Sequence, residues 1–188
     1  MQALLTSFTA ILMAEAGDKS QLVTLCMSAC HFPLQVFLGA ITALTIMTAL
    51  AAGFGGFFSG LVPQHIIAAV SGFYFIVIGI LTYLSREKQE NVKDKIDCRS
   101  RAFLHTFGLI FLAEIGDKTQ LTVIGLSAVT GAPFLVFAGT MLAQIINHGL
   151  VAFLGDKFLS RLPRSKLKLI SAVIFITLGL AVLILNIF

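Results

Sequence analysis

Charged residues are scarce in this chain of 188 residues, where Asp, Glu, Lys and Arg together account for 12% of the sequence. Hydrophobic residues account for 57%, and the mean hydropathy is +0.97. A soluble globular domain of this length needs a charged surface that such a composition does not supply, so that class is excluded. The composition instead predicts an all-α membrane protein.

Tryptophan is absent, so an aromatic belt at the membrane surface depends on the 17 Phe residues and the two Tyr. Arginine and lysine are absent from most of the chain. Apart from Lys19 and Lys118, the 13 basic residues fall into two segments, six at 86–101 and five at 157–168. Basic residues confined to loops beside apolar runs indicate membrane topology, and they exclude a nucleic-acid surface.

Long apolar runs predict six transmembrane helices. A spanning helix needs about 20 apolar residues, and the runs that meet this length are 3–29, 34–58, 65–85, 102–129, 133–155 and 168–187. The first and fourth runs are too long for a simple crossing, because such a helix reaches about 40 Å against a hydrocarbon core of about 30 Å. Each has a glycine among polar residues near its middle, which predicts a kink or break at Gly17 and Gly116.

Two nearly identical polar motifs interrupt these two long runs. Residues 14–22 read Ala-Glu-Ala-Gly-Asp-Lys-Ser-Gln-Leu, and residues 113–121 read Ala-Glu-Ile-Gly-Asp-Lys-Thr-Gln-Leu. A charged side chain at membrane depth costs about 3 kcal/mol or more unless it is paired or hydrated. The charged residues of both motifs are therefore functional candidates.

The motifs belong to an internal repeat that covers the whole chain. Identical residues recur at an offset of 99 around the motifs and at an offset of 100 further along. The repeat predicts a first three-helix unit at 1–85, a charged cytoplasmic linker at 86–101 and a second three-helix unit at 102–188. Because three is an odd number, the second unit enters the membrane inverted, as in many secondary transporters.

The distribution of basic residues predicts the orientation of the chain. With six spans, the loops at 31–33, 86–101 and 156–167 share one face of the membrane, and that face receives every basic residue outside the motifs. By the positive-inside rule this face is cytoplasmic. We therefore expect a multi-pass protein of the cell's inner (plasma) membrane with both termini outside the cytoplasm.

If a two-fold axis relates the halves, the motif carboxylates converge on one central metal site. Four carboxylates and two lysines leave a formal charge of −2, which either a divalent cation or two protons would neutralise. That equivalence is the basis of cation/proton exchange. The predicted metal ligands are Glu15, Asp18, Glu114 and Asp117; the supporting polar residues are Ser20, Gln21, Thr119 and Gln120; the charge-balancing or proton-coupling residues are Lys19 and Lys118.

Oxygen ligands suit Mn²⁺, Ca²⁺ or Mg²⁺ better than Cu⁺ or Zn²⁺. The oxygens alone do not separate manganese from calcium, although the sulfur of Met13 beside the first motif is a weak argument for manganese. In the fifth span, Asn147 and His148 stand where the first half has Met47 and Thr48. These two residues either supply the predicted site with an extra ligand or proton carrier, or serve only in helix packing.

Two copies of Glu-x-Gly-Asp-Lys-Ser/Thr in a small duplicated membrane protein resemble the calcium:cation antiporter-2 family. Its members include Golgi manganese/calcium transporters and bacterial manganese exporters of the MneA kind, and the size and layout of this chain are similar to the latter. The resemblance covers essentially the whole chain. It implies export of Mn²⁺ from the cytoplasm, with Glu15, Asp18, Glu114 and Asp117 matching the acidic positions of the family motif.

Several alternatives remain beside this interpretation. In one alternative the protein is a Ca²⁺/H⁺ antiporter. In another it exports a small organic solute, although four carboxylates suit a bare cation better than a zwitterion. An intramembrane lipid-phosphate hydrolase would need an arginine clamp, and all five Arg lie in the two basic segments, so an enzyme is not expected. Static ion pairs between helices would not require two copies of the motif. We expect no resident cofactor, with the metal ion and the lipid bilayer as partners.

Overall fold

The computed structural model describes residues 1–84, 101–155 and 164–187, and all regular structure within them is helical. The predicted all-α class is therefore confirmed. The predicted linker, except Arg101, and the basic positions from 157 to 163 lie outside the described residues. The eight described helices are α1 (Gln2–Glu15), α2 (Lys19–Cys30), α3 (Pro33–Leu61), α4 (Gln64–Leu84), α5 (Ala102–Glu114), α6 (Lys118–Thr130), α7 (Pro133–Leu154) and α9 (Arg164–Ile187).

Three of these helices, α3, α4 and α7, are long and apolar enough to cross a membrane by themselves. They correspond to the predicted second, third and fifth spans. The first and fourth predicted spans are each divided into two shorter helices, α1 with α2 and α5 with α6. The sixth predicted span corresponds to α9, which contains the shorter apolar stretch Ala172–Ile184.

The predicted breaks at Gly17 and Gly116 are confirmed, and each is a type II turn. At the first break Ala16 has φ −61° and ψ 109°, Gly17 has φ 84°, and the Asp18 amide donates to the Glu15 carbonyl at 3.0 Å. A type II turn requires positive φ at its third residue, which glycine adopts without strain. The second break repeats this geometry, with φ 73° at Gly116.

The interior of the bundle combines two apolar clusters with buried polar side chains, and its outer surface is apolar, as expected for helices surrounded by lipid. Glu15 and His148 are fully buried. By contrast, large apolar side chains of α3, such as Leu50, Phe54 and Phe57, are more than half exposed. Membrane-spanning helices associate through close packing and polar contacts, since burial of apolar surface gives no advantage over lipid.

Glycines let the helices of the two halves approach closely, and they do so reciprocally. A Cβ atom added to Gly39 of α3 would lie 2.5 Å from the Phe103 carbonyl oxygen of α5. The residue 100 positions later, Gly139 of α7, lies equally tightly against the Leu4 carbonyl of α1. Leu4 and Phe103 are themselves repeat partners, so each half packs on the other through the same contact.

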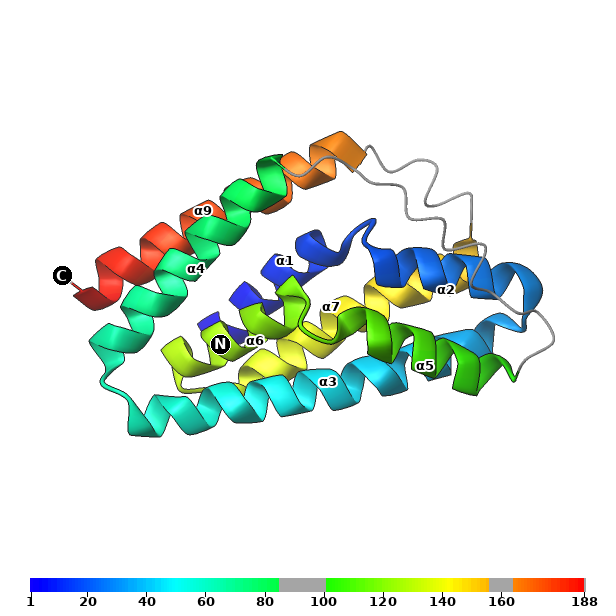
Figure 1. Cartoon of the computed structure of the whole chain (residues 1–188), viewed down its shortest axis with the longest axis horizontal. Coiled ribbons are helices and arrows are strands. Elements are labelled where there is room, and N and C mark those ends of the chain that lie inside the picture. Colours follow the sequence, from blue (N-terminus) through cyan, green and yellow to red (C-terminus); the bar gives the residue numbers. More distant parts are fainter. Residues whose placement is uncertain (85–100, 156–163, 188) are drawn as a thin grey trace.

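Helices α4 and α9 form an antiparallel pair beside the other six helices (Figure 1). Gly72 faces the carbonyl of Gly179, and Gly79 faces the carbonyl of Ala172. Residue numbers therefore increase along α4 in the direction in which they decrease along α9. The pair packs against α1 and α6 and makes no comparable contact with α2 or α5. The pair therefore packs against one segment of each broken helix and not against the other segment.

The turn geometry predicts that Gly17→Ala destabilises the protein. The alanine Cβ would meet no atom within 4 Å, so the whole effect comes from placing an L-residue at positive φ, which costs about 1–2 kcal/mol. The measurement is thermal unfolding of the purified protein in detergent. Gly53→Ala is the matched control, because Gly53 is helical, equally uncrowded and has no positive φ. An equal decrease in both variants would contradict this account of the break.

Candidate metal site

The two breaks place the acidic residues of each motif at facing helix ends. Glu15 is the last residue of α1, and Asp18 is the N-cap of α2, where its Oδ1 accepts a hydrogen bond from the Lys19 amide at 2.8 Å. Glu114 and Asp117 hold the same two positions at the end of α5 and the start of α6. Each pair thus lies where the chain leaves one helix and enters the next.

The motif glutamines stabilise the breaks. Gln21 Oε1 accepts a hydrogen bond from the Gly17 amide at 2.7 Å, and Gln120 Oε1 accepts one from the Gly116 amide at 2.9 Å. These amides have no helical acceptor once the helix is interrupted, and an unsatisfied amide inside a membrane is costly. The two glutamines therefore have a structural role at the predicted site. Each of them stands four residues after the glycine whose amide it accepts from, so the spacing within the motif accounts for this role.

An ion pair joins the two motifs directly. Lys118 Nζ lies 2.6 Å from Asp18 Oδ2, and both side chains are largely buried. The reciprocal pair of Lys19 with Asp117 is not formed within the described part of the chain, and Lys19 is exposed. Residues a hundred positions apart in the sequence are therefore neighbours, but the two lysines have different surroundings.

Glu15 is held by side chains of α7. Gln144 Nε2 donates to Glu15 Oε1 at 3.1 Å, while Glu15 Oε2 lies 4.0 Å from His148 Nε2. Neither Glu15 Oε2 nor His148 Nε2 has a hydrogen-bond partner among the described residues. The other ring nitrogen of His148 lies 2.8 Å from the hydroxyl of Thr24, which donates to the Ser20 carbonyl.

The Thr24 hydroxyl lies within hydrogen-bond distance of two groups, the Ser20 carbonyl at 3.0 Å and His148 Nδ1 at 2.8 Å. Its single proton goes to one of them, and the choice is linked to the tautomer of the His148 ring. In the tautomer that carries its proton on Nδ1, this nitrogen donates to Thr24, and Nε2 is an acceptor that faces the Glu15 carboxylate.

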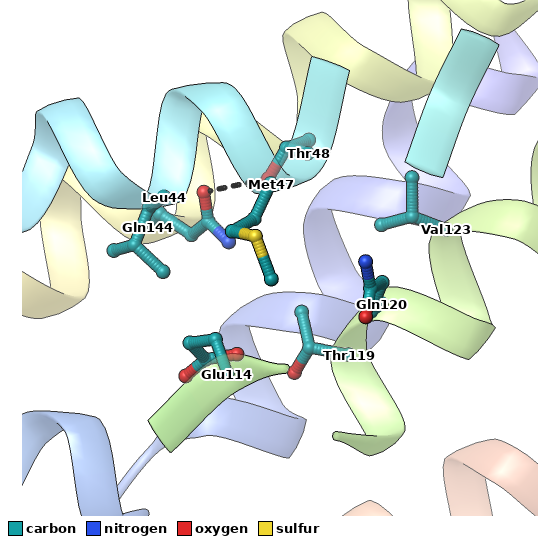
Figure 2. Close-up of a pocket in the computed structure, with 8 residues that line it drawn as sticks. All are labelled: Leu44, Met47, Thr48, Glu114, Thr119, Gln120, Val123 and Gln144. Atoms are coloured by element: carbon teal, nitrogen blue, oxygen red, sulfur yellow. Dashed lines mark hydrogen bonds between the residues drawn. The ribbon is translucent and has the colours of Figure 1, made fainter. Parts of the chain in front are cut away.

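Glu114 lines a small hollow between α3, the second break and α7 (Figure 2). The hollow measures about 10 Å³, close to the minimum that holds one water molecule. Thr119 Oγ1, which is buried there, has no hydrogen-bond partner in the described segments. Ser20 of the first motif is also buried, and its side chain interacts with the Glu114 carboxylate of the second. The hollow is lined by Leu44, Met47, Thr48, Glu114, Thr119, Gln120, Val123 and Gln144.

The four predicted ligands are near one another without forming a single closed cluster. The carboxylate of Glu15 interacts electrostatically with those of Glu114 and Asp18, and Asp117 interacts with Asp18. Within residues 1–84, 101–155 and 164–187, however, no three His, Cys, Asp or Glu side chains are grouped closely enough to hold a metal ion together. In this conformation Lys118 occupies one of the Asp18 oxygens.

The fifth-span residues have separate roles. Asn147 Nδ2 donates to the Leu12 carbonyl at 3.0 Å, which joins α7 to α1, whereas His148 points to Glu15. The sequence interpretation did not include Gln144, whose amide bonds Glu15. It also named Met13 as the nearby sulfur, but the methionine that lines the hollow is Met47. Gln144 stands three and four positions before Asn147 and His148, so helical spacing was the available signal that it shares their face.

One family model matches both halves of the chain. A family model described as divalent cation/proton antiporter GDT1 matches residues 3–90 and 102–187, one segment in each half. This match confirms the resemblance inferred from the doubled motif.

Named relatives cover most of the chain. GDT1-like protein 4 of Oryza sativa subsp. indica is 28% identical over 81% of this chain and 68% of its own length. GDT1-like protein 3 of Arabidopsis thaliana is 25% identical over 93% and 68%. A Vibrio cholerae protein named "Putative manganese exporter" is 27% identical over 96% of this chain and 90% of its own. No solved structure matches the chain.

The asymmetry of the lysines predicts unequal effects of their removal. Lys118→Met leaves the partly buried Asp18 carboxylate without its partner and costs about 1.5–3 kcal/mol, the range for a hydrogen bond to a charged group. Lys19→Met, on an exposed side chain, changes stability by less than about 0.5 kcal/mol. Thermal unfolding in detergent measures both.

A double variant, Asp18→Asn with Lys118→Met, tests the pair itself. Because both charges are removed together, its loss should be smaller than the sum of the two single losses. Additive losses, or equal losses for Lys118→Met and Lys19→Met, would show that the ion pair does not hold the motifs together.

Proposed function

The chain belongs to the GDT1 family of divalent cation/proton antiporters, and from that premise we propose that it exports Mn²⁺ from the cytoplasm in exchange for protons. The observation that carries the proposal is the meeting of the two motifs in the protein interior. Lys118 of the second motif pairs with Asp18 of the first, while Glu15 and Glu114 are both buried. The family and the named Vibrio relative support the class of substrate.

We propose that the chain crosses the membrane six times as two inverted repeats. The reciprocal contacts of Gly39 with Phe103 and of Gly139 with Leu4 support a two-fold relation between the halves. The antiparallel course of α4 and α9, which are repeat partners, supports an axis in the membrane plane. The gap in the family match falls at 91–101, within the predicted linker.

In this proposal the ligands of the cation are Glu15, Asp18, Glu114 and Asp117. The unloaded site carries more negative than positive charge, and a divalent cation or two protons offset the difference. Binding and release of Mn²⁺ therefore exchange with protons at the same oxygens. Lys118 acts as an internal substitute for the cation, because it neutralises Asp18 when no metal is bound. It must leave Asp18 Oδ2 before that oxygen binds the metal.

His148 is proposed as an additional ligand beside Glu15. Its Nε2 and Glu15 Oε2 are 4.0 Å apart with no hydrogen-bond partner among the described residues, and Nε2 can bind a cation when the ring carries its proton on Nδ1. Gln144 orients the same carboxylate through Oε1. A cation that reaches Glu15 thus finds one oxygen already fixed and the other free to bind.

The packing of α4 and α9 supports alternating access. The pair lies against α1 and α6 and not against α2 and α5 (Figure 1). In the repeat, however, α5 is the equivalent of α1, and α2 is the equivalent of α6. Two inverted repeats can exchange their conformations, and the exchanged state would place the pair against α2 and α5. The site would then open to the opposite face of the membrane.

Transport into inside-out vesicles tests the proposed function. Vesicles with the wild-type protein should accumulate ⁵⁴Mn²⁺, and faster when the lumen is acidic, because protons leaving the lumen exchange for entering Mn²⁺. Glu114→Gln and Glu15→Gln should reduce uptake at least about tenfold, the scale for loss of a group at a metal site. Thr42→Val is the control, since Thr42 is exposed and its hydroxyl bonds only its own helix.

Several results would overturn the assignment. Uptake of ⁴⁵Ca²⁺ with no ⁵⁴Mn²⁺ uptake would favour the Ca²⁺/H⁺ antiporter. The absence of both fluxes would favour an organic solute or hydrolytic chemistry. Full ⁵⁴Mn²⁺ uptake by both glutamine variants would remove the carboxylates from the mechanism.

Cysteine labelling tests the proposed topology. In a variant without native cysteines, Gln2→Cys should react with a membrane-impermeant maleimide added to intact cells. Ser100→Cys, in the predicted cytoplasmic linker, should react only after the membrane is permeabilised. The opposite pattern would reverse the orientation, and labelling of both positions from outside would exclude an odd number of spans per half.

A further inference from the structure

We propose that Met47 is the residue that makes the site prefer Mn²⁺ to Ca²⁺ and Mg²⁺. This inference rests on the proposed function and concerns the hollow beside Glu114. Figure 2 shows the Met47 thioether extending from α3 into that hollow, toward the side where Glu114 and Thr119 lie. The motifs themselves supply only oxygen and nitrogen, so the sulfur is a donor of a different kind.

Most polar groups that line the hollow already have partners. Gln120 Oε1 accepts from the Gly116 amide, and Gln144 Oε1 accepts from the Thr48 hydroxyl at 3.2 Å. Gln144 also donates to Glu15. These groups build the walls of the hollow and hold their shape through internal hydrogen bonds.

Three groups remain for a guest: the Glu114 carboxylate, the Thr119 hydroxyl and the Met47 thioether. Only 3% of the Thr119 surface is exposed, and its Oγ1 has no hydrogen-bond partner within the described residues. A buried hydroxyl left unsatisfied is costly. Its place beside a carboxylate therefore indicates that a ligand occupies the hollow during the transport cycle.

Met47 is buried, with 6% of its surface exposed, but it belongs to neither apolar core of the bundle. Met27 shows the ordinary role of a buried methionine, because it packs in the apolar cluster with Val36 and Leu44. The repeat partner of Met47 is Asn147, which bonds the Leu12 carbonyl. The thioether is thus a feature of one half only, at the hollow and not in the core.

A thioether among oxygens discriminates between divalent cations. Ca²⁺ and Mg²⁺ require oxygen ligands, and a sulfur that replaces one of their water molecules is a poor substitute. Mn²⁺ also prefers oxygen, but as a transition metal it accepts softer donors more readily than the alkaline-earth ions do. Met47 therefore acts mainly by penalising the competing ions.

Competition in the vesicle assay tests this role. The quantity measured is the ratio of the Ca²⁺ and unlabelled Mn²⁺ concentrations that halve ⁵⁴Mn²⁺ uptake, which does not depend on the amount of folded protein. Met47→Leu removes the sulfur at similar volume, and Met47→Gln replaces it with an oxygen donor. Both should lower the ratio about tenfold, the scale for a changed contact at a metal site. Met27→Leu, the matched core substitution, should leave it unchanged.

The outcomes separate this inference from the proposed function. If the wild-type protein takes up ⁵⁴Mn²⁺ but the ratio stays within twofold in both Met47 variants, Met47 is a packing residue and only the inference fails. The same conclusion follows if Met27→Leu lowers the ratio equally, or if the wild-type protein does not distinguish the two ions. If the wild-type protein moves no ⁵⁴Mn²⁺, the proposed function itself fails. Volume-conserving substitutions of this kind usually cost less than about 1.5 kcal/mol, so folded protein is expected for each variant.

Discussion

The structure depends on one constraint: charges placed at membrane depth must be satisfied by other parts of the protein. The pair of Lys118 with Asp18 satisfies two of them and joins the two halves of the chain at the same point. Glu15 and Glu114 are buried beside it. The bundle encloses these groups behind an apolar surface because they have to be kept from lipid.

Much of the repeated motif is explained by the helix break. Gly17 and Gly116 supply the positive φ of a type II turn, and Gln21 and Gln120 accept the amide hydrogen bonds that the interrupted helices leave open. Asp18 caps the helix that follows. With these roles assigned, the glutamates and the hydroxyl groups are the parts of the motif left for a guest ion, together with the Asp18 oxygen that Lys118 holds in this conformation.

The halves are alike in backbone and different in side chains around the site. Both breaks have the same turn, yet Lys118 is paired while Lys19 is exposed. The α7 side presents Gln144 and His148 to Glu15, whereas the α3 side presents Met47 to the hollow beside Glu114. Similar backbones with unequal side chains thus hold one carboxylate by hydrogen bonds and place the other beside a hollow.

The sequence by itself determined the all-α membrane class, the helix breaks at Gly17 and Gly116, and the family, because each follows from composition or from local spacing. The tertiary structure decided which distant side chains meet. Gln144 contacts Glu15 across 129 positions, and Met47 and not Met13 faces the hollow. Such contacts depend on how helices rotate and cross. The polar residues Thr140, Gln144, Asn147 and His148 recur at helical spacing and mark the buried face of α7, but their spacing does not show which distant side chain each of them meets.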